Sequence, residues 1–131
     1  MKRFLKIGVV AILGALLFVG CTSAAVYNVE KDEIMTSAST DKVYKAIRRA
    51  GHSKGWKVSQ VKPGLAQAQI NLRKHMAIVE IPYSSDDFSI VYKDSMNLNY
   101  DSTKGTIHKN YNGWIQNLEK QIQFEISSID E

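Results

Sequence analysis

The chain of 131 residues has one cysteine, two prolines and no apolar run long enough to cross a membrane. A single thiol cannot form a disulfide within the chain, so the fold must be stabilised by packing. The longest apolar run without a charge, Ile7 to Val19, has thirteen residues, whereas a transmembrane helix needs about 20. The sequence therefore argues against a disulfide scaffold and against a helical membrane span.

Recognisable catalytic and metal-binding motifs are also missing. His52, His75 and His108 are scattered, and none has a partner at the short spacing of metal ligands on a helix. The chain contains no Gly-x-Ser-x-Gly elbow and no glycine-rich phosphate loop. Aromatic and basic residues do not interleave as they do in a stacking platform for nucleic acid. We therefore predict a protein that is not an enzyme, with no catalytic residue, metal, cofactor or nucleic-acid partner.

The amino-terminal segment has the anatomy of an export signal. Lys2, Arg3 and Lys6 precede the apolar run, and Cys21 directly follows the small residue Gly20. A positive start, a short apolar stretch and a small residue near a cleavage point are typical of a signal peptide.

With its cysteine at the cleavage point, this segment resembles the signal of a bacterial lipoprotein. The resemblance implies that residues 1–20 are the signal peptide and that Cys21 becomes the lipidated first residue of the mature chain. Phe18 departs from the leucine that the family most often has at that position. The alternative is an ordinary secretory signal cleaved near Ala24 or Ala25, which would discard Cys21.

Removal of residues 1–20 changes the charge balance. That segment holds three of the seventeen basic residues and none of the thirteen acidic ones, so fourteen basic residues remain against thirteen acidic. The basic character of the whole chain therefore gives no reason to expect nucleic acid as a partner.

The mature part divides into a leader and one domain. Residues 21–39 are predicted to be a lipidated cysteine and a tether, in which Val26 to Val29 could form a short edge strand. Residues 40–131 predict a single α+β domain. A first helix should begin near Thr40, with Ser39 or Thr40 as its cap and an apolar stripe that includes Val43 and Ile47.

Alternating apolar residues predict strands in the middle of the chain. Ala66, Ala68, Ile70 and Leu72 alternate with polar residues, and similar alternation recurs around Trp56, Val79 and Ile90. The connections are too short for parallel crossovers. We expect an α+β fold in which an antiparallel meander of about four strands is flanked by the first helix and packed by a long C-terminal helix.

The C-terminal helix is predicted from a stripe at helical spacing. Its members are Ile107, Tyr111, Trp114, Leu118 and Ile122. We expect Tyr111 and Trp114 to lie in the core. We also expect Gly113 to permit a close contact with the sheet, because glycine inside a helix otherwise lowers stability.

The segment from Asp94 to Gly105 is the candidate binding loop. Asp94, Asn97, Asn99 and Asp101 supply side-chain oxygens, and the last three imitate the start of a calcium loop. The imitation fails because Ser102 stands where that loop needs glycine and His108 where it needs glutamate. We predict that this loop binds a partner and not a metal.

Residues 40–126 resemble a group of small uncharacterised proteobacterial lipoproteins. The resemblance rests on Asp94-Ser95-x-Asn97-Leu98-x-Tyr100 and on Ile107-His108-x-x-Tyr111-Asn112-x-Trp114-Ile115-x-x-Leu118. It implies a protein anchored in the bacterial envelope by lipid. A residue other than aspartate after the cysteine, here Thr22, implies the outer membrane, facing the periplasm.

Two functions fit these expectations. The first is a binding or scaffold module that docks on another envelope protein through a sheet edge or the candidate binding loop. The second is a small-ligand carrier with a pocket between the C-terminal helix and the sheet. The packing of the interior discriminates between them.

Overall fold

The computed structural model describes residues 22–129, so the predicted signal peptide and Cys21 lie outside the described residues. No helix in this range is long and apolar enough to cross a bilayer. The elements in chain order are β1 (Ser23–Ala25), β2 (Val29–Glu33), α2 (Thr40–Ser53), β3 (Trp56–Lys62), β4 (Leu65–Leu72), β5 (His75–Pro82), β6 (Asp87–Met96), β7 (Thr106–His108) and α3 (Lys109–Ser127).

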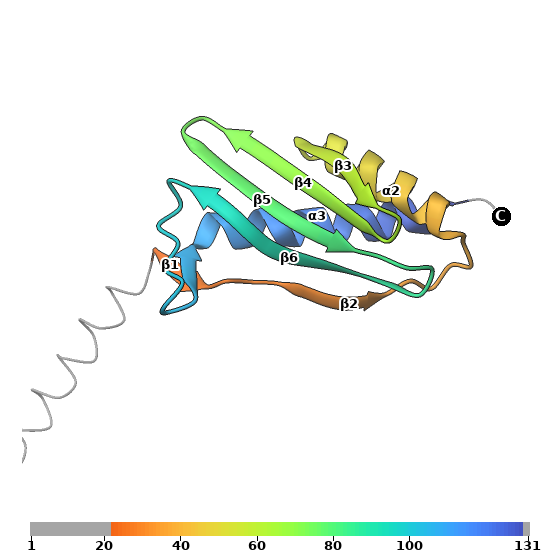
Figure 1. The fold of residues 1–131 in the computed structure, drawn as a ribbon, viewed down its shortest axis with the longest axis horizontal. Coiled ribbons are helices and arrows are strands. Elements are labelled where there is room, and N and C mark those ends of the chain that lie inside the picture. The colour runs from red at the N-terminus through yellow and green to blue at the C-terminus, as the bar shows by residue number, and fades with distance from the viewer. Residues whose placement is uncertain (1–21, 130–131) are drawn as a thin grey trace, which may run out of the picture.

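The fold is α+β, as predicted, with a five-stranded antiparallel sheet in the order β2-β6-β5-β4-β3. Strands β3 to β6 form the expected meander, and β2 adds a fifth strand beside β6. Both helices cover one face of this sheet, with α3 running along its length (Figure 1). A separate pair of short strands, β1 and β7, forms a second antiparallel sheet.

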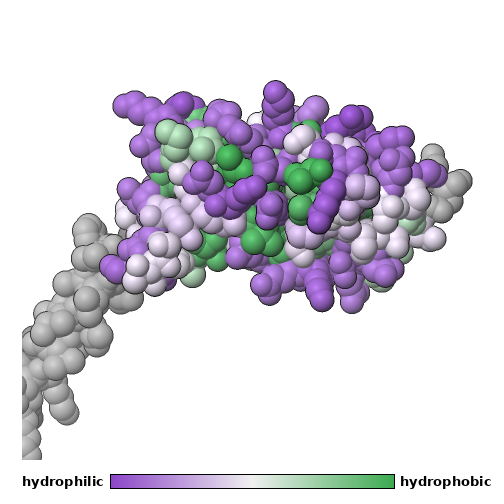
Figure 2. All heavy atoms as spheres, in the orientation of Figure 1, coloured by the Kyte–Doolittle hydropathy of each residue, from purple (hydrophilic) through white to green (hydrophobic). Residues whose placement is uncertain are grey.

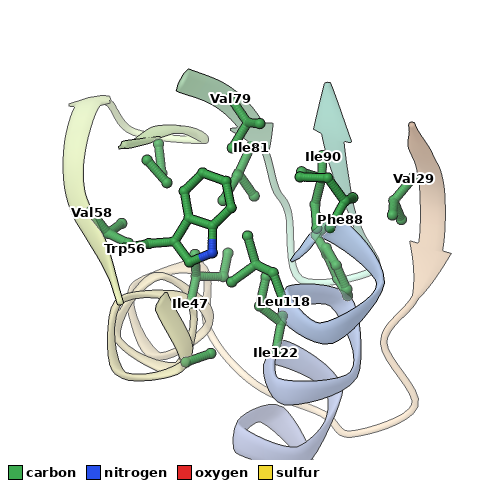
Figure 3. Packing of buried hydrophobic residues seen from close by; sticks show 14 of the residues in the cluster. Val29, Ile47, Trp56, Val58, Val79, Ile81, Phe88, Ile90, Leu118 and Ile122 are labelled. Carbon is green, nitrogen blue, oxygen red and sulfur yellow. The ribbon is translucent and has the colours of Figure 1, made fainter. Parts of the chain in front are cut away.

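The alternation in the sequence places the core between the sheet and the helices. Ala66, Ala68 and Ile70 of β4 are buried, while Gln67 and Gln69 between them are only partly so. Figure 3 shows Trp56 of β3, Ile81 of β5 and Leu118 of α3 pointing into the same space. Apolar side chains from every layer therefore meet in a single interior.

The opposite face of the sheet has no helix on it. It is mainly hydrophilic around a few apolar side chains (Figure 2). Lys93 Nζ lies 3.5 Å from Glu80 Oε2 and donates a hydrogen bond of 3.0 Å to Gln67 Oε1, which links three neighbouring strands. Polar side chains on this face therefore find some of their partners on neighbouring strands of the same sheet.

Helix α2 begins at one of the two predicted caps and ends shortly before a glycine. The Oγ of Ser39 accepts a hydrogen bond from the backbone N–H of Lys42, and Gly55 follows the helix with a φ of 88°. Gly51 lies within the last turns of the helix and approaches β3 closely. A Cβ atom added at Gly51 would lie 2.3 Å from Cγ2 of Val58, so this position has no room for a side chain.

Helix α3 has the predicted stripe from Tyr111 to Ile122, with three corrections. Ile107, expected at the start of the stripe, lies in β7 and not in the helix. Tyr111 and Leu118 are fully buried, but Trp114 is only partly buried at the margin of the core. The prediction for Gly113 was wrong, because a Cβ atom there would meet nothing within 4 Å. Gly51 is instead the helical glycine that permits close packing.

The segment expected to be a tether contains ordered structure from Thr22 onward. Strand β1 pairs with β7, and β2 pairs with β6. The backbone N–H of Ile34 then donates to the carbonyl of Asp86 across 2.8 Å. The polar composition of this segment suits an edge position, where one side of the strand remains in water. We call residues 22–34 the N-terminal strap.

Candidate functional site

The candidate binding loop is shorter than expected, because Asp94 to Met96 are the last residues of β6. The rest joins β6 to β7 and is fixed to the domain by apolar side chains. Leu98 is 2 % exposed, and the ring of Tyr100 stacks on that of Tyr92 with centroids 4.2 Å apart. The backbone N–H of His108 donates to the carbonyl of Leu98 across 2.8 Å. The loop is therefore a rigid surface feature and not a loose connection.

Asn97 ties the loop to the turn between β4 and β5. Its Nδ2 donates to the carbonyl of Lys74 across 2.6 Å, and its own carbonyl accepts from Nδ1 of His75 across 2.7 Å. Asn97 and Asn99 have φ values of 60° and 53°, a left-handed conformation that asparagine tolerates better than most residues. This explains why asparagine suits both positions without any bound ligand.

The two aspartates of the loop are bonded to nearby backbone. Oδ1 of Asp101 accepts from the N–H groups of Thr103 and Lys104, at 2.9 and 3.0 Å. Asp94 accepts from the N–H of Ser95 at 2.8 Å. Among residues 22–129 no three His, Cys, Asp or Glu side chains gather closely enough to hold a metal ion.

Three of the four predicted site residues border one hollow. It is open to solvent, has a volume of about 590 Å3, and is lined by Tyr92, Lys93, Asp94, Ser95, Asn97, Leu98, Asn99 and Tyr100. Asp101 is not part of its lining. The hollow presents amide, hydroxyl, ammonium and carboxylate groups around an aromatic ring, which suits polar contacts with another molecule's surface.

Tyrosine side chains form the wall behind the hollow. Tyr92 contacts Tyr100 on one side and Tyr111 on the other, with the second pair of ring centroids 5.8 Å apart. Burial raises the pKa of Tyr92, and it raises the pKa of Tyr111 far more. These phenols therefore stay protonated at neutral pH and are unsuited to general base chemistry.

The hydroxyl of Tyr111 is the one buried side-chain polar atom in the described part of the chain with no hydrogen-bond partner. The ring is fully buried in the first turn of α3. An unsatisfied hydroxyl in this position lowers stability, and the packing of the ring compensates for it.

A second polar site, which the sequence reasoning missed, joins α3 to the N-terminal strap. Asn112 accepts from the N–H of Tyr27 at 2.9 Å and donates to the carbonyl of Ala25 at 2.8 Å. Further along the helix, Nε2 of Gln123 donates to the carbonyl of Glu33 at 2.8 Å. Asn112 therefore supplies hydrogen-bond partners to backbone groups of the strap, as a neighbouring strand does in a sheet.

Glu119 lies between these two amides along the helix and is partly buried. It accepts a hydrogen bond of 2.8 Å from the hydroxyl of Tyr27. Burial, together with the nearby carboxyl of Asp32, raises the pKa of Glu119. The available signal was the spacing of Asn112, Glu119 and Gln123 by seven and four residues, which forms a polar stripe along one side of the helix.

Comparison with known proteins adds no relative: no family model, curated protein or solved structure matches the chain.

Proposed function

We propose that this protein is a bacterial envelope lipoprotein whose folded part is a non-catalytic binding module for another envelope protein. In this proposal Cys21 carries the lipid, and the protein is anchored in the outer membrane with its folded part facing the periplasm. The resemblance of residues 1–21 to a lipoprotein signal supports this address. The observation that carries the binding role is the rigid, polar hollow formed by β6 and the candidate binding loop.

The interior favours a binding module over a small-ligand carrier. A carrier of the expected kind needs a pocket between α3 and the sheet, typically of about 300 Å3 or more. Fully buried apolar side chains occupy that position, among them Phe88 and Ile90 of β6 and Ile115 and Leu118 of α3. Polar contacts with a partner therefore have to be made on the outside of the domain.

Asn99 offers a sharp test of the hollow. Its side chain makes no hydrogen bond with another residue of the described chain, and its left-handed backbone is one that glycine adopts without strain. Asn99→Gly therefore removes an amide from the hollow and leaves the loop in place. Asn117→Ala, on the exposed side of α3, is the matched control.

The experiment is crosslinking in cells followed by purification of the intact lipoprotein. We expect an envelope protein that is recovered with the wild type and with Asn117→Ala, and that is reduced with Asn99→Gly. Equal recovery with all three forms would contradict the role of the hollow. Cys21→Ser and the intact mass of the purified protein test the lipid anchor separately.

A further inference from the structure

Several segments that are distant in sequence meet at the end of the domain where the described chain begins. Figure 1 shows β1, the turn between β4 and β5, and the C-terminal end of β6 at this end. We call it the proximal end and define it by three segments, residues 22–25, 72–75 and 96–109. We propose that the proximal end lies against the lipid headgroups of the membrane that holds Cys21. This inference rests on the proposed function, since it requires the lipid on Cys21.

The anchor point is fixed to the proximal end. The carbonyl of Thr22 accepts from the N–H of Lys109 across 3.1 Å, and Ser23 is paired with His108. Cys21 is the next residue along the chain, and one residue spans at most about 3.6 Å. A lipid on Cys21 would therefore hold Thr22 close to the membrane surface. A flexible tether of about twenty residues would instead allow the domain to stand away from the membrane.

The proximal end exposes apolar side chains from two of its three segments. Met96 is 58 % exposed, Leu72 45 % and Tyr100 42 %. These are large apolar groups that water solvates poorly, and they belong to the same end of the domain as the fixed anchor point. Aromatic and long apolar side chains of this kind are favoured at the boundary between headgroups and acyl chains.

Exposed basic residues surround these side chains. Arg73 and Lys74 occupy the turn between β4 and β5, and Lys104 and Lys109 flank β7. The acidic side chain within the three segments is Asp101, whose carboxylate is bonded to backbone N–H groups. An excess of positive charge at this position complements a bilayer that contains anionic lipid.

The basic turn and the candidate binding loop form one rigid unit. Asn97 and Lys74 are joined through the hydrogen bond of 2.6 Å, and His75 closes the same junction at 2.7 Å. The ring of His75 in turn lies 6.4 Å from that of Trp114 on α3. The proximal end therefore meets the membrane as one preformed surface, with no segment that has to fold on contact.

This arrangement also sharpens the proposed function. Part of the hollow belongs to the same loop, so the hollow would be held at the level of the bilayer surface. A partner that reaches it is expected to be embedded in, or lie on, the same membrane.

The test uses the acylated full-length mature protein in vesicles of phosphatidylethanolamine with a minority of anionic phosphatidylglycerol. A spin label is attached at Thr103→Cys on the proximal end, or at Ser85→Cys in the turn between β5 and β6, and its accessibility to a water-soluble nickel complex is measured. We expect the label at position 103 to be several-fold less accessible than the label at position 85. Equal accessibility of the two labels would overturn the inference.

Charge reversal separates lipid contact from protection by the protein itself. We expect Arg73→Glu with Lys74→Glu to restore the accessibility of the label at position 103. Lys57→Glu with Lys62→Glu, the same change on β3, should leave it low. Protection that survives the first pair unchanged would overturn contact with anionic lipid.

The anchor and the partner are measured on the same preparation. An acylated protein that captures its partner but stands off the bilayer overturns this inference alone. A protein without lipid on Cys21 overturns the proposed address and this inference together.

Discussion

Helices α2 and α3 cover the same face of one sheet, but different interactions hold them there. Helix α2 packs on β3 through small and apolar residues, and Gly51 brings its backbone against Val58. Its ionic link to the other helix is the pair between Arg49 Nε and Glu125 Oε1, at 3.1 Å. Close packing is the interaction that holds this helix on β3, although β3 is an edge strand of the sheet.

Helix α3 packs on the sheet and also supports the N-terminal strap. Its apolar stripe faces the core, while Asn112, Glu119 and Gln123 bond to the strap along the adjacent side. The strap has peptide groups between β1 and β2 that no strand satisfies, and a helix can satisfy them only with side chains. The comparison shows that a helix that also supports backbone groups left without partners by the sheets needs polar as well as apolar complementarity.

The largest expected effect breaks the packing of α2. Gly51→Ala should lower the free energy of unfolding by about 1–3 kcal/mol, because the stiff side chain of Val58 cannot move aside cheaply. Urea denaturation measures the change. In a double-mutant cycle, Val58→Ala should restore part of this loss. A Gly51→Ala variant as stable as the wild type would show that the close contact does not contribute to the free energy of unfolding.

The next effect breaks the polar support of α3. Asn112→Ala should lower the free energy of unfolding by about 1–2 kcal/mol, because the N–H of Tyr27 and the carbonyl of Ala25 lose their partner. Hydrogen exchange should accelerate at Tyr27. Asn117→Ala is the control on the same helix, and unchanged exchange at Tyr27 would contradict the role given to Asn112.

Gly113→Ala sharpens the comparison by reversing the sign of the Gly51 substitution. The position is helical and its added Cβ meets open space, so we expect a gain of about 0.5–1 kcal/mol from helix propensity. Thermal unfolding of Gly51→Ala and Gly113→Ala side by side measures the contrast. Destabilisation by both substitutions would refute it.

The smallest effect concerns pH. Because the pKa of Glu119 is raised in the folded state, its protonated form favours folding, and that contribution is lost as pH rises from the unfolded-state pKa through the folded one. Glu119→Gln keeps an acceptor for Tyr27 and removes the charge beside Asp32. We expect it to add a few tenths of a kcal/mol at neutral pH and to flatten the decline between about pH 4.3, the ordinary pKa of glutamate, and neutral pH.

Stability measured across that pH range checks the prediction. Glu30→Gln, an exposed change on β2, is the control for the loss of one charge. A loss of stability at neutral pH with Glu119→Gln would mean that the ionised carboxylate supports the strap.

The strands and helices that depend on periodic burial could be predicted from the sequence. The alternation of Ala66, Ala68 and Ile70 and the stripe through Tyr111 and Leu118 report directly which side faces the core. The short connections between the alternating segments predicted the antiparallel meander for a similarly local reason.

The strap could not be predicted with the same means. Strand β2 has little alternation, and Lys31 adopts a φ of 50° at an irregular point of its pairing with β6. Its order depends on distant partners, such as Ser89, whose Oγ accepts from the N–H of Lys31 at 3.0 Å. The close contact expected at Gly113 occurs at Gly51 for a similar reason, since only the neighbouring strand decides whether a helical glycine is needed.

The side-chain oxygens of the candidate binding loop are visible in the sequence, but the extension of β6 to Met96 and the hydrogen bonds of those oxygens were not foreseeable. Asn97 and Asp101 look alike in the sequence, yet one bonds to another turn and the other to its own. Which polar atoms remain available to a partner is therefore a property of the folded loop and not of its composition.

The fixed strap has a mechanical consequence. A force applied to Cys21 would act first on the short pairing of β1 with β7 and then on the amide of Asn112. Behind them, the longer β2 and the core of the domain would carry load only after these few bonds had broken. The domain would thus yield in two steps under tension, and the first step would lengthen the distance between Cys21 and the sheet while leaving the sheet intact.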